Sequence, residues 1–206
     1  GLVIAKSTSA AEGWFVTYRE SSVPSGWGYM YLNFNYPAQG DSTYCTPDAD
    51  NLVLNGSTIA AVGAEYVAYL FAEDEPGLIK CGNYTGASGS QTINCGFEPQ
   101  WILIKTTEVN NESWQIFDSK RGFAPSAKKL SPDTSGSEVN LGNACTVTAV
   151  GFTVNDTNEV GKPGANYIFV AIAAPVVESM TAEQFTETQA KFLTYDNRKQ
   201  VKEGED

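Results

Sequence analysis

Leu2-Val3-Ile4-Ala5-Lys6 and Trp101-Ile102-Leu103-Ile104-Lys105 are two versions of one apolar strand that ends in a lysine. Further landmarks follow each version in the same order. They are Trp14 and Trp114, Leu32 and Leu130, Cys45 and Cys145, Asn55 and Asn155, and finally 63–67 (GAEYV) and 164–168 (GANYI). The offset stays between 98 and 101 residues, which is the length of one domain and far above the roughly 20–50 residues of a solenoid repeat. The sequence therefore predicts an internal duplication.

Only the second copy begins with a lead-in segment, at 77–100. We therefore predict a first domain over 1–76, which is an N-terminally truncated repeat, and a second domain over 77–178. Residues 179–206 are predicted to form a C-terminal helix with a charged tail. Because the first residues already have the pattern of a strand, we expect the chain to be a segment of a longer protein. Tandem domains of this kind are typical of extended surface or scaffold proteins.

Composition excludes two classes of partner. The net charge is −11 and the isoelectric point is about 4.4, and basic residues cluster only in the C-terminal tail. Such a chain repels phosphate backbones, so we expect no nucleic-acid partner. No apolar run approaches the roughly 18 residues of a transmembrane helix, so we expect no membrane insertion.

Short apolar stretches bounded by Gly, Pro, Asn or Asp predict an all-β fold. The expected strands are 2–6, 13–18, 28–35, 52–54, 66–72, 101–106, 114–118, 127–130, 146–154 and 167–173. Two more, at 77–84 and 91–97, flank a small-residue loop and are predicted to form a hairpin. The fold class is therefore two tandem antiparallel β-sandwiches or jelly rolls.

A helix is predicted over 181–201. Thr181 can cap its N-terminus, and Phe185, Phe192 and Tyr195 recur at helical spacing. The stripe is too narrow for the helix to be stable alone. We expect this helix to lie at a contact between subunits of a homo-oligomer.

The four cysteines divide into two pairs. In a symmetric hairpin that turns at Ser88, Cys81 and Cys95 would lie opposite each other, within disulfide reach. The alternative is two small apolar thiols that pack across the hairpin. Cys45 and Cys145 are equivalent positions in the two copies, so buried free thiols are expected there. The absence of a CxxC or histidine-bearing cluster argues against structural zinc.

Catalysis is not expected. The chain contains no histidine, which excludes Ser-His-Asp and Cys-His mechanisms. The acidic residues at 73–75 have no counterpart in the second copy and are typical of a solvated turn. Oxygen-bearing residues at 48–51 and 155–158 do not complete a calcium loop. We predict a protein that is not an enzyme and has no cofactor or resident metal.

An aromatic row is the candidate binding site. Trp27, Tyr29 and Tyr31 alternate on one face of a strand, and Tyr36 follows just beyond. Exposed, these rings could stack on sugar rings or pack against another subunit; the alternative is ordinary core. The second copy has no such row, so the predicted contact surface belongs to the first copy alone. Trp14 and Trp114 recur in both copies and are expected in the core.

Several motifs occur in a fixed succession along the chain. They are 66–72 (YVAYLFA), 79–86 (IKCGNYTG), 96–105 (GFEPQWILIK), 117–118 (FD) and 121–122 (RG). This succession resembles a repeat found in large tail proteins of tailed bacteriophages, many of them marine, over about residues 1–180. The resemblance supplies no catalytic residues.

The resemblance implies a virion structural protein, part of a tail fibre or tail adhesin that is assembled in the host cytoplasm. Other tail subunits, a host-surface glycan and two further copies of the chain, in a trimer, are the partners that it implies. Two alternatives fit the same composition. One is a carbohydrate-binding module of a secreted polysaccharide-degrading protein, and the other is a capsid-decorating head fibre.

Overall fold

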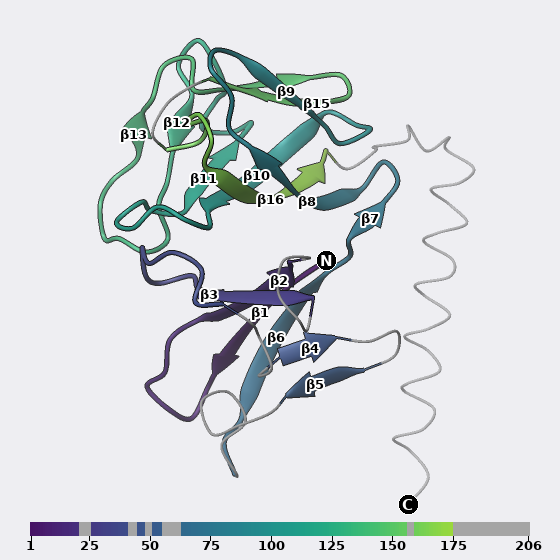
Figure 1. Ribbon diagram of the computed structural model, residues 1–206, viewed down its shortest axis with the longest axis vertical. Coiled ribbons are helices and arrows are strands. Elements are labelled where there is room, and N and C mark those ends of the chain that lie inside the picture. Colours follow the sequence, from purple (N-terminus) through teal and green to yellow (C-terminus); the bar gives the residue numbers. More distant parts are fainter. Residues whose placement is uncertain (21–25, 41–44, 48–50, 55–62, 156–158, 175–206) are drawn as a thin grey trace, which may run out of the picture. The chain divides into compact units, whose positions relative to one another are not determined.

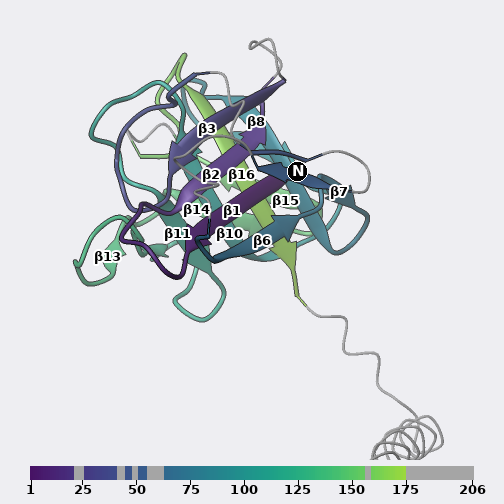
Figure 2. The same cartoon turned by 90° about the horizontal axis from the view of Figure 1, so that it is seen from below.

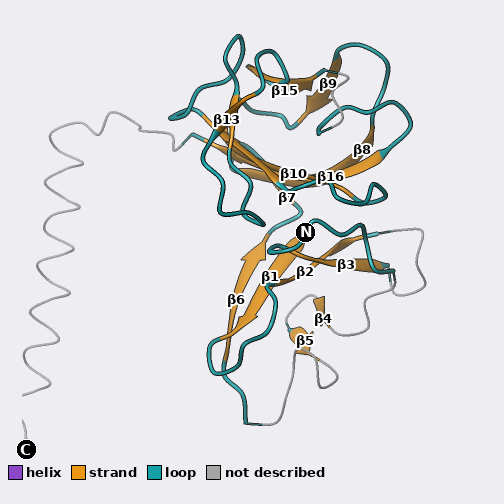
Figure 3. Cartoon of the chain, turned by 90° about the vertical axis from the view of Figure 1, so that its left-hand side faces the viewer, coloured by secondary structure: helices purple, strands orange, loops and turns teal. Residues whose placement is uncertain are grey.

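The structure is a computed structural model that describes residues 1–20, 26–40, 45–47, 51–54, 63–155 and 159–174. Every regular element of these residues is a β-strand, coloured orange in Figure 3. Residues 1–174 form one compact unit. The prediction of an all-β protein is confirmed. The predicted helix at 181–201 lies outside the described residues, and the domain division at 76/77 stays a prediction.

The first half of the chain forms a four-stranded antiparallel sheet in the order β3-β2-β1-β6. Its strands are β1 (Leu2–Ser7), β2 (Phe15–Arg19), β3 (Trp27–Tyr31) and β6 (Tyr66–Phe71). A two-stranded sheet of β4 (Cys45–Pro47) and β5 (Leu52–Leu54) belongs to the same half. The central strand β1 carries apolar residues toward both faces and is buried almost throughout.

The second half forms a five-stranded antiparallel sheet in the order β11-β10-β16-β8-β7 (Figure 1). Its strands are β7 (Asp74–Glu75), β8 (Ile79–Thr85), β10 (Pro99–Thr106), β11 (Gln115–Asp118) and β16 (Asn166–Ala173). A three-stranded sheet, in the order β14-β15-β9, contains β9 (Gln91–Asn94), β14 (Cys145–Thr148) and β15 (Gly151–Val154). A short pair joins β12 (Lys128–Lys129) to β13 (Val139–Asn140).

The predicted hairpin at 77–97 is wrong. β8 pairs with β16 and β7, whereas β9 pairs with β15 in a different sheet. The small-residue loop between β8 and β9 therefore crosses from one sheet to the other. The segment predicted as one strand at 146–154 is itself a hairpin of β14 and β15.

Figure 2 labels strands of both large sheets, among them β1, β2, β10 and β16. The two sheets share one register. Leu2 lies opposite Tyr18 and Phe71, and Trp101 lies opposite Asp118 and Ile172, at offsets of 99, 100 and 101 residues. The hydrogen-bond ladders β1–β6 and β10–β16 also end with the same backbone contact. Thr8 N–H donates to the Glu65 carbonyl at 2.8 Å, and the corresponding Thr107 N–H donates to the Asn166 carbonyl at 2.9 Å.

One predicted correspondence is corrected by this register. Leu130 forms a bridge to Ile116, as Met30 lies opposite Val16. Leu130 therefore corresponds to Met30 and not to Leu32. The offset is 100 residues on both strands, so the connecting loop has the same length in the two halves. Matching leucine to leucine at an offset of 98 placed the pair two residues away.

Three apolar clusters hold the described residues together. The shared core contains side chains from both large sheets, among them Leu2, Ile4, Val16, Leu103 and Trp114. The C-terminal core lies on the other face of β10 and β16 and the N-terminal core on the other face of β1. In the shared core, Trp114 is fully buried and its Nε1 donates to the Tyr31 carbonyl at 2.9 Å.

The core prediction for the two tryptophans is confirmed for Trp114 and only in part for Trp14, which packs partly buried against the shared core. Trp114 is buried, whereas Trp14 is partly exposed and stacks on Tyr69 with ring centroids 6.5 Å apart. Their backbones nevertheless make the same contact. Trp14 N–H donates to Asn33 Oδ1 at 2.7 Å, and Trp114 N–H donates to Asp133 Oδ1 at 3.1 Å.

Candidate functional site: a polar cavity

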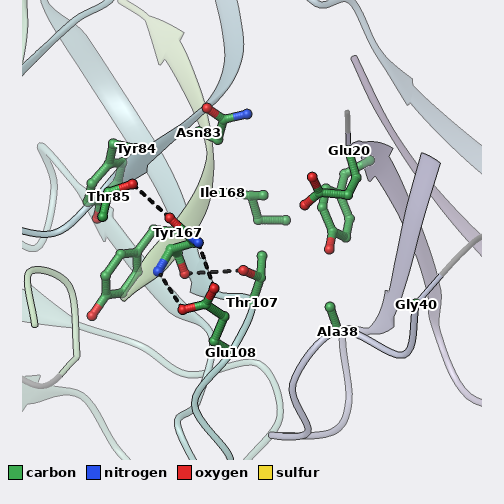
Figure 4. Close-up of a pocket in the computed structure, with 12 residues that line it drawn as sticks. Glu20, Ala38, Gly40, Asn83, Tyr84, Thr85, Thr107, Glu108, Tyr167 and Ile168 are labelled. Carbon is green, nitrogen blue, oxygen red and sulfur yellow. Dashed lines mark hydrogen bonds between the residues drawn. The ribbon is translucent and has the colours of Figure 1, made fainter. Parts of the chain in front are cut away.

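A polar cavity of about 400 Å³ is lined by residues of both halves (Figure 4). β2 and the residue after it supply Tyr18 and Glu20, and the segment after β3 supplies Ala38 and Gly40. Residues at the ends of β8, β10 and β16 supply Asn83, Tyr84, Thr85, Thr107, Glu108, Asn166, Tyr167 and Ile168. The strand ends place two carboxylates, two amides and two threonine hydroxyls around one space.

Asn166 organises one wall of the polar cavity. Its side-chain Nδ2 donates to Glu108 Oε1 at 2.6 Å, and its backbone N–H donates to Glu108 Oε2 at 3.2 Å. Thr85 Oγ1 donates to Asn166 Oδ1 at 2.7 Å. Thr107 N–H and Oγ1 both donate to the Asn166 carbonyl, at 2.9 and 3.3 Å. Asn166 thus holds the Glu108 carboxylate in one orientation.

Three tyrosines back the polar cavity. The rings of Tyr84 and Tyr167 stack with centroids 5.0 Å apart, and Tyr84 donates to the Val160 carbonyl at 2.6 Å. Burial raises the pKa of Tyr84 and of Tyr167, and burial followed by the Glu20 carboxylate raises the pKa of Tyr18. All three phenols therefore stay protonated at neutral pH.

This lining matches a neutral polyhydroxyl ligand. Carboxylate and amide oxygens accept hydrogen bonds, and threonine hydroxyls both donate and accept. The two glutamates and the overall charge of −11 disfavour phosphates and other anions. The described lining contains no thiol and no amine that could act as a nucleophile, and the chain has no histidine to serve as a base.

The predicted aromatic row is only partly at the surface. Trp27 is 6% exposed, with the Arg19 guanidinium 4.4 Å above its ring, so an exposed contact role for Trp27 is wrong. Tyr29 and Tyr31 are partly buried around Phe15 in the N-terminal core. The physical reason is that this face of β3 is covered by its own sheet neighbours.

Tyr36, the last predicted contact residue, is 51% exposed. Its ring stacks on Phe34, with centroids 5.4 Å apart and an interplanar angle of 19°. In the predicted strand at 28–35, alternation would put Phe34 on the face opposite Tyr29 and Tyr31. β3 ends at Tyr31, however, and the chain then turns, so Phe34 joins Tyr31 and Tyr36 in one run of rings.

The cysteines described by the structure are free. The predicted disulfide between Cys81 and Cys95 is wrong, because both thiols are free. The alternative is correct that they are buried thiols but wrong that they pack across a hairpin, since Cys81 lies in the shared core and Cys95 in the C-terminal core. Burial raises the pKa of both to about 11 and that of Cys145 to about 12. These thiols are protonated and unreactive at neutral pH. The Cys45 side chain lies outside the described residues.

Two of the three acidic residues at 73–75 form ion pairs with basic side chains. Asp74 and Glu75 form β7, and Asp74 pairs with Lys80 at 2.5 Å, while Glu73 pairs with Arg19 at 3.6 Å. Within the described ranges no three Asp, Glu or Cys side chains are grouped to hold a metal ion. No described helix is long and apolar enough to cross a membrane.

Sequence reasoning did not identify the polar cavity. Asn83 and Tyr84 lie in one of the motifs quoted above, and Asn166 and Tyr167 lie in the recurring GANYI stretch. A polar residue directly before each of these tyrosines was the available signal. It could not be used because only tertiary structure brings the ends of β8, β10 and β16 together.

The chain belongs to the family described as Domain of unknown function (DUF7483), which matches residues 1–175. The match spans both halves and every described residue of the polar cavity. No curated protein and no solved structure matches the chain.

Proposed function

We propose that this chain is a non-enzymatic attachment module of a virion tail protein and that its polar cavity binds a neutral glycan of the host surface. The preset Glu108–Asn166 pair carries the proposal. Both Glu108 oxygens are positioned by Asn166 donors, and each retains lone pairs for sugar hydroxyls. A preorganised acceptor binds more tightly than a mobile one, because no further free energy is needed to order it when the ligand binds.

Exposed rings that closely precede a cavity residue in the chain support a saccharide over other polyols. Ala38 lines the cavity, and its N–H donates to the Thr107 carbonyl at 2.8 Å. The stacked pair of Phe34 and Tyr36 comes just before Ala38 in the chain. Aromatic faces pack on the C–H faces of sugar rings, whereas side-chain oxygens bind their hydroxyls. A longer oligosaccharide would use both features.

The tail location is supported by the ordered motifs quoted in the sequence analysis. Other tail subunits are the proposed partners, and a trimer joined through 181–206 is the proposed assembly. Deleting 181–206 should shift the particle mass in light scattering to that of a monomer, with the β circular dichroism retained. An unchanged particle mass would remove this segment from the assembly contact.

We further propose that the two halves arose by internal duplication into two sandwich-like domains. The equal registers of the two large sheets support this origin. So do the paired backbone contacts of Trp14 and Trp114. A duplication accounts for such agreement without a separate cause for each contact.

Glycan binding is testable with a matched pair of variants. Glu108→Gln keeps the size of the side chain but replaces one acceptor oxygen with a donor. We expect it to weaken binding of neutral oligosaccharides by about tenfold or more, or about 1–3 kcal/mol, in isothermal titration after a glycan-array screen. The control is Ser9→Ala. Ser9 is the counterpart of Glu108 in the first half, accepts from Glu65 N–H at 2.9 Å and lies outside the cavity.

Two results would contradict the proposal. One is a screen in which the parent protein binds no neutral glycan. The other is binding that Glu108→Gln and Ser9→Ala weaken equally. Co-purification of the full-length protein with tail subunits tests the location separately. Glycan binding without virion attachment would instead favour a carbohydrate-binding module of a secreted protein.

A further inference from the structure

The outer edges of the two large sheets differ. β6 is the outermost described strand of its sheet, whereas its counterpart β16 has β8 on its outer side (Figures 1 and 3). At the offset of 101 residues, Leu70 corresponds to Ala171 and Tyr69 to Val170. Leu70 is 63% exposed and Tyr69 50%, while Ala171 and Val170 are 0% and 1% exposed. The same backbone positions are thus exposed in the first half and buried in the second.

The small sheets differ in the same way. Cys45 lies opposite Leu54 in the β4–β5 pair, as Cys145 lies opposite Val154 in the β14–β15 pair. β15 has β9 on its other side, but among the described residues β5 has no strand there. Phe152 of β15 is fully buried, whereas its counterpart Leu52 is only partly buried. β8 and β9 both belong to the lead-in, so one segment accounts for both differences.

The lead-in also completes a core. It contributes Tyr84, Ile93, Cys95 and Phe97 to the C-terminal core. The N-terminal core consists of buried Val3 and Phe15, with Tyr29, Tyr31, Leu52 and Ala68 packed partly against them. Apolar side chains left at a sheet edge lose the stabilisation that burial provides, about 25 cal/mol per Å². The N-terminal core is the arrangement expected when a lead-in is not in place.

The backbone of β6 can accept a strand. Because Thr8 N–H donates to the Glu65 carbonyl, the alternation of an antiparallel pair directs Val67, Tyr69 and Phe71 to β1. Ala68 and Leu70 then direct their N–H and C=O groups away from β1. An edge of this kind is a template for an added strand.

We propose that the outer edges of β6 and β5 take up an extended lead-in of the β8–β9 type, supplied by a neighbouring domain of the same family. The added strand runs antiparallel to β6. In the register of β8 on β16, its positions equivalent to Lys80 and Gly82 lie opposite Leu70 and Ala68. Neither edge lines the polar cavity, so this inference is independent of glycan binding.

The occupant of the β6 edge is less restricted than β8 at one position. A Cβ on Gly82 would lie 2.8 Å from the Phe169 ring, so a side chain there would force this ring to shift. β6 has Ala68 where β16 has Phe169. The strand that pairs with β6 can therefore carry either glycine or a larger residue opposite Ala68, so a copy of β8 also fits there.

The experiment supplies the lead-in within the full chain. A copy of residues 77–99 is placed directly before Gly1, where it has the spacing to β1 that the resident lead-in has to β10. Amide hydrogen exchange is then measured at Ala68 and Leu70. We expect exchange at both amides to slow by tenfold or more relative to the parent chain, with a higher thermal midpoint.

The control carries the same extension with Lys80→Pro and Gly82→Pro in the added copy only. Proline removes the N–H groups that would bond to β6, so this variant should exchange like the parent. Equal slowing in both extended proteins would overturn the proposal, as would no slowing in either. Ala68 and Leu70 amides that are already protected in the parent, and lose protection on dilution, would assign the edge to a second copy and also overturn it.

Discussion

Lys105 is a fully buried lysine, and Lys6 is its counterpart in the first half. Its Nζ donates to the Thr106 carbonyl at 3.0 Å, and Lys6 Nζ makes the same contact with the Ser7 carbonyl at 2.7 Å. Lys6, however, lies partly exposed. Burial lowers the pKa of Lys105 to about 8, although the carboxylates of Asp133 and Glu112 act to raise it. Its charge at neutral pH therefore opposes folding.

This burial predicts a pH dependence with a definite sign. Between pH 8 and about 10.5 the unfolded chain binds more protons at Lys105 than the folded chain, so its contribution to the unfolding free energy rises with pH and is lost as pH falls through 8. Lys105→Met should raise the unfolding free energy at pH 7 by about 1–3 kcal/mol. Lys6→Met should change it by less than about 0.5 kcal/mol.

Urea denaturation at pH 7, 8 and 9.5 checks this prediction. The difference between Lys105→Met and the parent isolates the lysine, because the raised pKa values of Cys81 and Cys145 lower the stability of both proteins at alkaline pH. The difference should shrink as pH rises. A difference that stays constant from pH 7 to 9.5 would mean that Lys105 is not charged and desolvated in the folded protein.

At the scale of the element, β8 is constrained by the strand beside it. Gly82 lies opposite Phe169, whose ring occupies the space that a side chain would need. Gly82→Ala should lower the unfolding free energy by about 1–3 kcal/mol, the usual cost of overpacking. Gly136→Ala is the matched control, because the nearest atom to its added Cβ is Thr134 Oγ1 at an ordinary 3.6 Å. Denaturant unfolding measures both, and equal stabilities would show that the Phe169 ring can move aside.

At the scale of the whole molecule, the shared core joins the two halves. It contains counterparts from each large sheet, such as Ile4 and Leu103, so equivalent faces pack on each other as in a two-fold dimer. Trp114→Ala should cost about 3–5 kcal/mol because it opens a cavity in this core. Trp14→Ala should cost less, since Trp14 is partly exposed.

The same contact predicts how the protein unfolds. Trp114→Ala should speed amide exchange in β1 and β2 as well as in β10 and β16, since both sheets lose packing in one cluster. Hydrogen exchange by mass spectrometry resolves the four strands. Faster exchange confined to β10 and β16 would show that the first half is stable without the shared core.

The sequence by itself determined the all-β class and most strand positions, because short apolar runs with Gly, Pro and Asn boundaries are local signals. It also indicated which strands correspond, and the matched registers of β1 and β10 agree with that correspondence. Leu130 was misplaced because identical residue types were matched at an offset of 98, whereas the strand pairing keeps the offset at 100. The free thiols of Cys81 and Cys95 were one of two alternatives that the sequence left open.

Only the tertiary structure decided which sheet each lead-in strand joins, which aromatic rings are covered, and where the polar cavity lies. β8 and β9 have similar strand patterns, and their partners β16 and β15 are distant in sequence. Trp27 and Tyr36 are both large aromatic residues, yet Trp27 lies under Arg19 and Tyr36 is exposed. Alternation reports which side chains share a face, but burial depends on what packs against that face. Glu108 and Asn166 become a site for the same reason, since strand pairing brings their distant segments together.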